Sequence, residues 1–287
     1  MKIFKIELSS PINIEDINLA IGNFDGIHIG HQKLIKKLVS QSKEKKIDPT
    51  VMSFTPHPRQ FFTKKFENFN IISENLKVKL LDEMGVKNYI LFKFDKNIAA
   101  LSPEEFIDRI LNKKFKIKNL LVGLDFKFGQ NRKGDVNLLK KKSSIYNFNV
   151  SILDQIKLKK TSEIFSSTLI RNNIQNGNFE KVNSCLGRNW SIEGIVISGD
   201  KRARKMNFPT ANIIPPKLVY PKKGVYIVEV FFEKNKYKAI ANFGVRPTVD
   251  GEKLLLEIHI FDFNSDLYGK YLTVEFLTFI RGERKFA

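Results

Sequence analysis

The sequence contains one cysteine, one tryptophan and four histidines in 287 residues. The single thiol, Cys185, excludes an internal disulfide and makes a cysteine metal site a poor interpretation. We expect it to be a small core residue. Long apolar runs are also missing, because no stretch approaches the roughly 20 residues of a membrane helix. The first 22 residues lack a cationic segment followed by a long apolar one. We therefore expect a cytoplasmic protein with no membrane partner.

Acidic residues are the minority charge. The chain has 30 Asp and Glu against 49 Lys and Arg, which gives a formal net charge of +19. Such a balance is typical of proteins with a polyanionic partner, such as nucleic acid, a membrane surface or a phosphorylated ligand. The lysines occur in short scattered groups beside polar residues, as on solvated helix faces. We favour surface charge together with phosphate ligands, and we do not expect a nucleic-acid partner.

The first two thirds of the chain alternate between two hydrophobic periods. Short apolar runs predict strands at residues 19–21, 51–54, 89–94, 120–123 and 150–153. Segments with helical spacing lie between them. The best marked begins at Ser102, with Pro103 at the first helical position and Glu105 completing a capping box. The alternation predicts an α/β domain of Rossmann type, with a parallel sheet that binds ligands beyond the carboxyl ends of its strands.

From about Gly194 the apolar residues alternate with period two, which predicts an antiparallel sheet or a small closed barrel. The runs are EGIVISG, GVYIVEVFFE, KYKAIANFG, LLLEIHIFDF and KYLTVEFLTFI. Two short helical pieces ending at Gly187 precede them. We place the boundary near residues 184–190, which predicts domains at residues 1–185 and 186–287.

A glycine-rich motif, GNFDGIHIGH, occupies residues 22–31, directly after the predicted strand at residues 19–21. We expect it to turn and enter a helix near Gly30, so that backbone N–H groups and the positive end of the helix dipole face one space. Gly30 lets the backbone approach closely, and His28 and His31 can donate to one anion. Adenylyl transfer requires mainly a held triphosphate and a stabilised α-phosphate charge. The motif therefore predicts nucleotide binding, with an incidental turn or a metal site as alternatives.

The extended string resembles the adenylyltransferase module of the bacterial bifunctional riboflavin kinase and FAD synthetase family. Three further segments follow in the family's order: SFTPHPRQFF, LLVGLDFKFGQNRKGD and SSTLIR. Hydroxyls at a helix N-terminus and an arginine one turn later would make a second phosphate clamp. The resemblance implies catalytic roles for His28, His31 and Arg171, flavin contacts from His57, Pro58, Asp125 and Phe128, and ATP contacts from Gly22, Asn23, Phe24, Asp25, Gly30, Ser167 and Thr168.

The second region contains PTAN at residues 209–212. Thr210 and Asn212 lie two apart on an extended stretch, so they point to the same side and offer hard oxygen atoms suited to Mg²⁺. A turn into a strand is the alternative. Glu257, a lone carboxylate in the alternating LLLEIHIF, is either a solvent-facing strand residue or a positioned base.

These residues resemble the riboflavin kinase module of the same family, together with KKGVYIVEV, ANFGVRPTV, LEIHIFDFNSDLYGKYLTVEF and IRGERKF. The resemblance implies a C-terminal antiparallel six-stranded β-barrel in which Thr210 and Asn212 hold the Mg²⁺ of ATP. Glu257 would take the proton of the riboflavin 5′-hydroxyl. Further ATP contacts are implied for Gly199, Lys201 and Pro209. The expected activity is phosphorylation of riboflavin to FMN, then adenylylation of FMN by ATP to FAD with release of pyrophosphate.

Two departures from the family pattern leave a second interpretation. Ala203 and Asn207 stand where the family's nucleotide loop normally has glycine, and the given sequence stops at Ala287, where the family usually continues from RGERKF into a C-terminal helix. An FMN adenylyltransferase with a weakened or inactive kinase barrel is therefore the alternative. A nucleic-acid-binding protein would need aromatic residues interleaved with arginine on an exposed face, and a transferase with another acceptor leaves the barrel unexplained. Whether the chain forms a homo-oligomer is left open.

Overall fold

The computed structural model describes the chain except residues 12–13, 65–67, 157–162, 198–209, 249–250 and 284–287. Contacts divide the chain into two units. The first is Met1–Phe66 with Glu74–Phe165, and the second is Glu67–Ser73 with Ser166–Ala287. The second unit therefore includes a short segment from the N-terminal half of the chain. Within the described residues, none of the helices combines the length and apolarity required to cross a bilayer.

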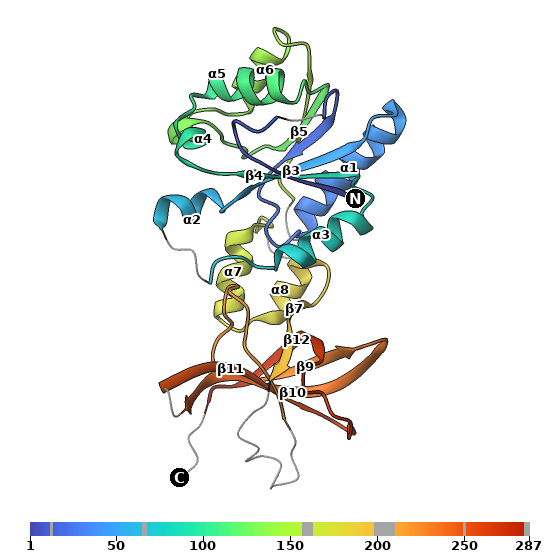
Figure 1. Ribbon diagram of the computed structural model, residues 1–287, viewed down its shortest axis with the longest axis vertical. Coiled ribbons are helices and arrows are strands. Elements are labelled where there is room, and N and C mark those ends of the chain that lie inside the picture. Colours follow the sequence, from blue (N-terminus) through green and yellow to red (C-terminus); the bar gives the residue numbers. More distant parts are fainter. Residues whose placement is uncertain (12–13, 65–67, 157–162, 198–209, 249–250, 284–287) are drawn as a thin grey trace. The chain divides into compact units, whose positions relative to one another are not determined.

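The first unit contains a six-stranded parallel sheet in the order β1-β4-β3-β2-β5-β6. Figure 1 shows α5 and α6 on one side of this sheet and α1 and α3 on the other. The elements are β1 (Lys2–Ile6), β2 (Asn18–Ile21), α1 (Ile29–Lys45), β3 (Pro49–Thr55), α2 (Pro58–Thr63), α3 (Glu74–Glu83), β4 (Asn88–Lys93), α4 (Lys96–Ala100), α5 (Pro103–Glu105), η1 (Phe106–Lys114), β5 (Asn119–Gly123), η2 (Gln130–Arg132), α6 (Val136–Ser143) and β6 (Asn149–Leu153). The predicted parallel α/β architecture is confirmed.

The five predicted strands correspond to β2 to β6, and β1 was not predicted. β2 is buried throughout, as the short apolar run indicated, because a central parallel strand is covered on both faces. β1 lies at the sheet edge beside β4, and only its last residue, Ile6, is buried. An edge strand of this kind carries too little apolar pattern to be recognised.

The predicted capping box is confirmed. Ser102 Oγ accepts from the Glu105 backbone N–H at 3.1 Å, and Glu105 Oε2 accepts from the Ser102 backbone N–H at 2.8 Å. The helix that starts there continues as a π-helix, η1 (Phe106–Lys114), which the sequence pattern did not predict. Its buried side chains, among them Phe106 and Leu111, pack into the core of the first unit.

In its described residues the second unit contains the helices α7 and α8 and a closed six-stranded barrel with strand order β10-β11-β8-β7-β12-β9. The elements are α7 (Ser167–Gln175), α8 (Phe179–Leu186), β7 (Trp190–Ile197), β8 (Ala211–Ile213), β9 (Gly224–Phe232), β10 (Asn235–Thr248), β11 (Gly251–Ile260) and β12 (Tyr271–Arg281). The expected antiparallel barrel is confirmed, and α8 ends at Gly187, which adopts φ 68°. Cys185 is a buried core residue, as expected.

The two helices α7 and α8 group with the barrel by their contacts, whereas the predicted boundary at residue 185 assigns them to the first domain. Residues 68–73, hereafter the 68–73 segment, also belong to the barrel unit. Asn70 bridges to Leu218, and its carbonyl oxygen accepts from Val219 N–H at 2.8 Å. The Trp190 indole N–H donates to the Ile71 carbonyl oxygen at 2.7 Å. Because Ile71 and Ile72 are buried, this segment completes the packing of the second unit.

Candidate functional site

The loop between β2 and α1 makes a tight turn with unusual backbone conformations. Phe24, Gly26 and Ile27 have φ values of 48°, 85° and 41°. A positive φ is a rare conformation for a branched residue such as Ile27 and persists only where the surroundings enforce it. Phe24 and Ile27 are both 1% exposed, so burial of these two side chains holds the turn. The predicted passage from strand through turn to helix is confirmed.

His28 and His31 lie together at the start of α1. His28 is the N-cap, and its Nδ1 accepts from the His31 backbone N–H at 3.3 Å. The two imidazoles are stacked, with ring centroids 3.6 Å apart and an interplanar angle of 21°. Because Nδ1 of His28 accepts, the neutral ring carries its proton on Nε2. The pair therefore presents an imidazole N–H beside the unpaired backbone donors of a helix N-terminus.

The environment of His31 keeps its ring neutral. Burial lowers the His31 pKa well below its ordinary value, and the neighbouring His28 and the positive charge of Lys77 lower it further. Within the described part of the chain, the buried Nδ1 of His31 and the buried Oδ1 of Asn23 have no hydrogen-bond partner. A buried polar atom without a partner costs about 1–3 kcal/mol, so both atoms are candidate contacts for a ligand at this loop.

Gly30 and Gly22 make room for the rings of this loop. A Cβ added to Gly30 would lie 3.0 Å from His28 Cε1 and 3.1 Å from His28 Nδ1. A Cβ at Gly22 would lie 3.1 Å from the Phe24 ring. Asp25, the remaining predicted ATP contact, is 3% exposed. All the predicted nucleotide residues before residue 32 thus gather in one loop of the first unit.

The predicted flavin residues of PHP cap a short helix. His57 Nδ1 accepts from the Arg59 N–H at 3.0 Å, and Gln60 Oε1 accepts from the His57 N–H at 3.2 Å. Pro58 is the first residue of α2. This capping box fixes the His57 ring, whatever else the ring contacts, and the flavin role of His57 and Pro58 stays a prediction.

Phe128, also predicted to contact flavin, is a core residue in this structure. It is 6% exposed, and its ring lies 5.4 Å from that of Phe106 and 5.6 Å from that of Phe126. Asp125 is exposed in the turn after β5, and its Oδ1 would lie 3.0 Å from a Cβ at Gly123. The flavin contacts of Asp125 and Phe128 remain predictions. The Phe128 ring packs beneath the turn that follows β5.

The predicted second phosphate clamp forms the start of α7 in the second unit. Ser166 is the N-cap, and its Oγ accepts from Leu169 N–H at 3.2 Å. Ser167 and Thr168 occupy the first turn. The Arg171 guanidinium is held by the 68–73 segment: Nε donates to the Phe69 carbonyl oxygen at 2.9 Å, and the guanidinium carbon lies 3.9 Å from the Phe69 ring centroid. The sequence did not indicate Phe69.

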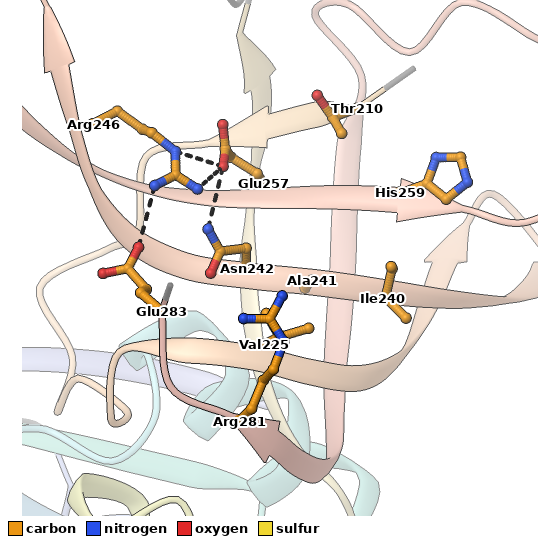
Figure 2. A pocket seen from close by; sticks show the side chains of 10 residues that line it. All are labelled: Thr210, Val225, Ile240, Ala241, Asn242, Arg246, Glu257, His259, Arg281 and Glu283. Carbon is orange, nitrogen blue, oxygen red and sulfur yellow. Dashed lines mark hydrogen bonds and ion pairs between the residues drawn. The ribbon is translucent and has the colours of Figure 1, made fainter. Parts of the chain in front are cut away.

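The barrel contains a cavity of about 460 Å³ in which two of the predicted kinase residues lie. Figure 2 shows its lining, which comprises Thr210, Val225, Ile240, Ala241, Asn242, Arg246, Glu257, His259, Arg281 and Glu283. Asn212 of β8 pairs in register with Glu257 of β11. It is 6% exposed, and its Oδ1 has no hydrogen-bond partner among the described residues. Thr210, Asn212 and Glu257 are therefore brought to one region of the barrel.

Glu257 is held by an arginine that the sequence analysis did not single out. Arg246 donates to Glu257 Oε2 through Nε, at 2.7 Å, and through Nη2, while its Nη1 donates to Glu283 Oε1 at 3.2 Å (Figure 2). A usable signal was present, since ANFGVRPTV places one arginine in a strand whose neighbour carries the lone Glu257. Gly199, Lys201 and Pro209, with Ala203 and Asn207, lie outside the described residues.

No group of three or more His, Cys, Asp or Glu side chains in the described ranges could hold a metal ion. The hydroxyl of Thr210 and the amide oxygen of Asn212 are donors of the kind that could hold a metal ion in the barrel, together with water or phosphate oxygens.

Comparison with known proteins gives two consecutive matches. Residues 11–169 match the family model of FAD synthetase, and residues 186–287 match that of riboflavin kinase. A bifunctional riboflavin kinase/FMN adenylyltransferase of Buchnera aphidicola subsp. Acyrthosiphon pisum is 38% identical over 284 residues, which cover 96% of this chain and 89% of the relative. The Escherichia coli K12 protein of the same name is 36% identical over 270 residues, with coverage of 94% and 86%.

A solved structure agrees over the full length. A crystal structure from Streptococcus pneumoniae, described as a macrolide-efflux protein, superimposes with a TM-score of 0.87 at 30% identity and covers 99% of this chain and 93% of that one. The two consecutive family matches and the near full-length relatives together show that this chain belongs to the family of bifunctional riboflavin kinase/FMN adenylyltransferases.

Proposed function

We propose that this chain makes FAD from riboflavin in two reactions. The kinase reaction transfers the γ-phosphate of ATP to riboflavin and gives FMN and ADP. The adenylyltransferase reaction joins the AMP part of a second ATP to FMN and releases pyrophosphate. The observation that carries the proposal is that both enzyme families match, one after the other, along this chain.

In the adenylyltransferase reaction we assign phosphate binding to the loop at the start of α1. An FMN phosphate oxygen attacks the α-phosphorus of ATP, and the bond to the bridging oxygen of the pyrophosphate breaks. Negative charge on the α-phosphate is then stabilised by the His28 Nε2–H, the neutral His31 and the N-terminal N–H groups of the helix. The support is the stacked pair of imidazoles held at the N-cap position. Arg171, Ser167 and Thr168 are assigned to the ATP phosphates in the same reaction, and His57, Pro58, Asp125 and Phe128 to the flavin.

In the kinase reaction we assign proton acceptance to Glu257. Its carboxylate would take the proton of the riboflavin 5′-hydroxyl as that oxygen attacks the γ-phosphorus and ADP leaves. The location of Glu257 in a cavity, on the strand beside Asn212, supports this assignment.

The residues present fit a magnesium ion. Asn212 offers a buried amide oxygen without a partner in the described part of the chain, and Thr210 lines the neighbouring cavity with a hydroxyl. Both are hard oxygen donors, and Mg²⁺ usually keeps several waters and binds substrate phosphates alongside few protein ligands. When bound, the ion would offset the negative charge of the ATP phosphates. We also expect both reactions in the cytoplasm, since each consumes ATP, with no nucleic-acid partner.

The test follows the two products separately. Purified protein is incubated with ATP and Mg²⁺ and either riboflavin or FMN, and the three flavins are separated over time. We expect His28→Ala or Arg171→Ala to lose FAD formation while FMN formation persists, and Asn212→Ala or Glu257→Ala to do the reverse. Loss of both activities from either pair of variants, in folded protein, would contradict two separate active sites.

The alternative, an adenylyltransferase with an inactive barrel, rests on Ala203, which stands where the family's nucleotide loop normally has glycine. The match of residues 186–287 to riboflavin kinase does not favour it. Formation of ADP from ATP and riboflavin decides between the two, because only an active kinase releases ADP.

A further inference from the structure

We propose that Arg246 and Glu283 are positioning residues that hold the Glu257 carboxylate for the kinase reaction. This inference rests on the proposed role of Glu257 as the proton acceptor. The three side chains form a row along the cavity: Glu257 of β11, Arg246 of β10 and Glu283 just beyond β12 (Figure 2).

The hydrogen bonds to Glu257 are one-sided. Arg246 donates twice to Oε2, through Nε and through Nη2. Among the described residues, no hydrogen bond ends on Oε1. A carboxylate fixed through one oxygen keeps its other oxygen available and correctly aimed for a substrate hydroxyl. This arrangement is what a proton acceptor requires, whereas a purely structural ion pair would use either oxygen.

Arg246 is itself fixed from its other end. Its Nη1 donates to Glu283 Oε1 at 3.2 Å, so the planar guanidinium is held between two carboxylates. A guanidinium has a rigid fork of donors, which makes its orientation depend on both partners. Glu283 therefore acts on Glu257 only through Arg246.

The neighbouring backbone makes room for the Glu283 carboxylate. A Cβ added to Gly244 of β10 would overlap the carboxylate of Glu283. The absence of a side chain at position 244 thus permits the contact between the residue after β12 and Arg246. A side chain at position 244 would require the Glu283 carboxylate to move away from Arg246.

The test measures kcat and KM for FMN formation in the full-length protein. We expect Arg246→Met to lower kcat about 10- to 100-fold while KM for riboflavin changes less than about threefold. The reason is that the Glu257 carboxylate loses its orientation while riboflavin still binds. Arg246→Lys keeps the charge without the fork and should recover only part of kcat. FAD formation from FMN serves as the internal control and should stay unchanged.

A matched control is offered by another ion pair of the same barrel. Lys236 contacts Glu229 at 2.7 Å and lies outside the lining of the cavity. Lys236→Met removes a carboxylate-bound cation and should leave kcat for FMN formation unchanged. If it lowers kcat as much as Arg246→Met does, the effect is general to the barrel and the inference is wrong.

The dependence of Glu283 on Arg246 is tested by a double variant. Glu283→Ala should lower kcat about 3- to 10-fold alone, and should cause no further loss when added to Arg246→Met. If the losses of kcat from the two substitutions multiply in the double variant, Glu283 does not act through Arg246 and the inference is wrong. If the thermal unfolding curve shows that Arg246→Met does not fold, the same comparison is made with Glu283→Ala in the Arg246→Lys background.

Failure of this inference can be told apart from failure of the proposed function. Glu257→Gln tests the function, because FMN formation that persists in this variant means that Glu257 is not the proton acceptor. Loss of FMN formation in Glu257→Gln together with unchanged kcat in Arg246→Met overturns only the positioning role.

Discussion

A Cβ added at position 30 would lie 3.0 Å from Cε1 of the His28 imidazole. The choice of residue at position 30 and the position of the His28 ring are therefore coupled. The close approach of the His28 ring is a steric reason for glycine at position 30, in addition to the position of this residue at the start of a helix. The same ring accepts from the His31 backbone and stacks on the His31 ring. A side chain at position 30 would therefore press on a ring that both of these His31 contacts depend on.

We predict that Gly30→Ala lowers FAD formation about 10-fold or more, because the added Cβ displaces the His28 ring. Alanine is a better helix former than glycine by about 1 kcal/mol, so the unfolding midpoint should not fall. The measurement is the rate of FAD formation from FMN beside a thermal unfolding curve, with FMN formation as the control. Unchanged FAD formation would show that the ring has room to move without loss.

The lowered pKa of His31 predicts a pH dependence of stability. Its pKa in the folded protein is well below its ordinary value of 6.5, so the unfolded chain binds a proton that the folded chain does not. The free energy of unfolding should therefore fall as pH drops below about 6.5, by at most about 1.4 kcal/mol per pH unit from this group. His31→Asn should show a shallower slope in denaturant unfolding between pH 5 and 7. Equal slopes in both proteins would contradict the assignment.

At the scale of elements, α7 is tied to a segment that is distant in sequence. The Arg171 side chain is anchored by both the carbonyl oxygen and the ring of Phe69. A cation over an aromatic face contributes about 0.5–2 kcal/mol, depending on solvation. The orientation of Arg171 therefore depends on the 68–73 segment as well as on its own helix.

We predict that Phe69→Ala lowers FAD formation about 2- to 30-fold and leaves FMN formation nearly unchanged, since the ring that orients Arg171 is removed. Phe69→Tyr should retain the activity because it keeps an aromatic face. Initial rates from FMN and from riboflavin, measured on the same preparations, give the comparison. A loss in Phe69→Tyr equal to that in Phe69→Ala would argue against the ring as the cause.

Much of this architecture could be predicted because its signals are local. The apolar runs of β2 to β6, the capping box at Ser102 and the alternation of the barrel strands each appear within about ten residues of sequence. The His28 and His31 arrangement could also be foreseen from the spacing within one turn of helix. The π-helical continuation at Phe106 has no such signal.

The contacts that were missed join residues far apart in the chain. Phe69 meets Arg171, Ile71 accepts from Trp190, and Arg246 reaches Glu257 only once β10 and β11 are in register. Local pattern carries no information about such pairs, since they depend on how the strands and helices are brought together. The positioning residues of both candidate sites fall in this class.

At the scale of the whole molecule, the barrel unit is not a continuous stretch of chain. Ile71 and Ile72 of the 68–73 segment are 0% and 2% exposed and belong to the second unit. Burying two such side chains contributes about 3–6 kcal/mol, which is comparable to the net stability of many domains. Residues 166–287 alone therefore lack part of their own packing.

We predict that a fragment of residues 166–287 is unfolded or strongly destabilised, and that addition of the fragment 1–165 restores FMN formation. Trp190 is the sole tryptophan and is 1% exposed, so its fluorescence reports on the second unit. Its emission should be red-shifted in the isolated fragment and return toward the intact value on mixing. A fragment 166–287 with full kinase activity and native Trp190 emission would disprove the requirement.

The 68–73 segment also constrains the order of events during synthesis. It leaves the ribosome about 200 residues before the last barrel strand, which at about 5–20 residues per second means roughly 10–40 s. During that interval the first unit can fold on either side of the segment, while the barrel that buries Ile71 and Ile72 has not yet been translated. A gene divided at the module boundary would accordingly leave part of the kinase on the other polypeptide.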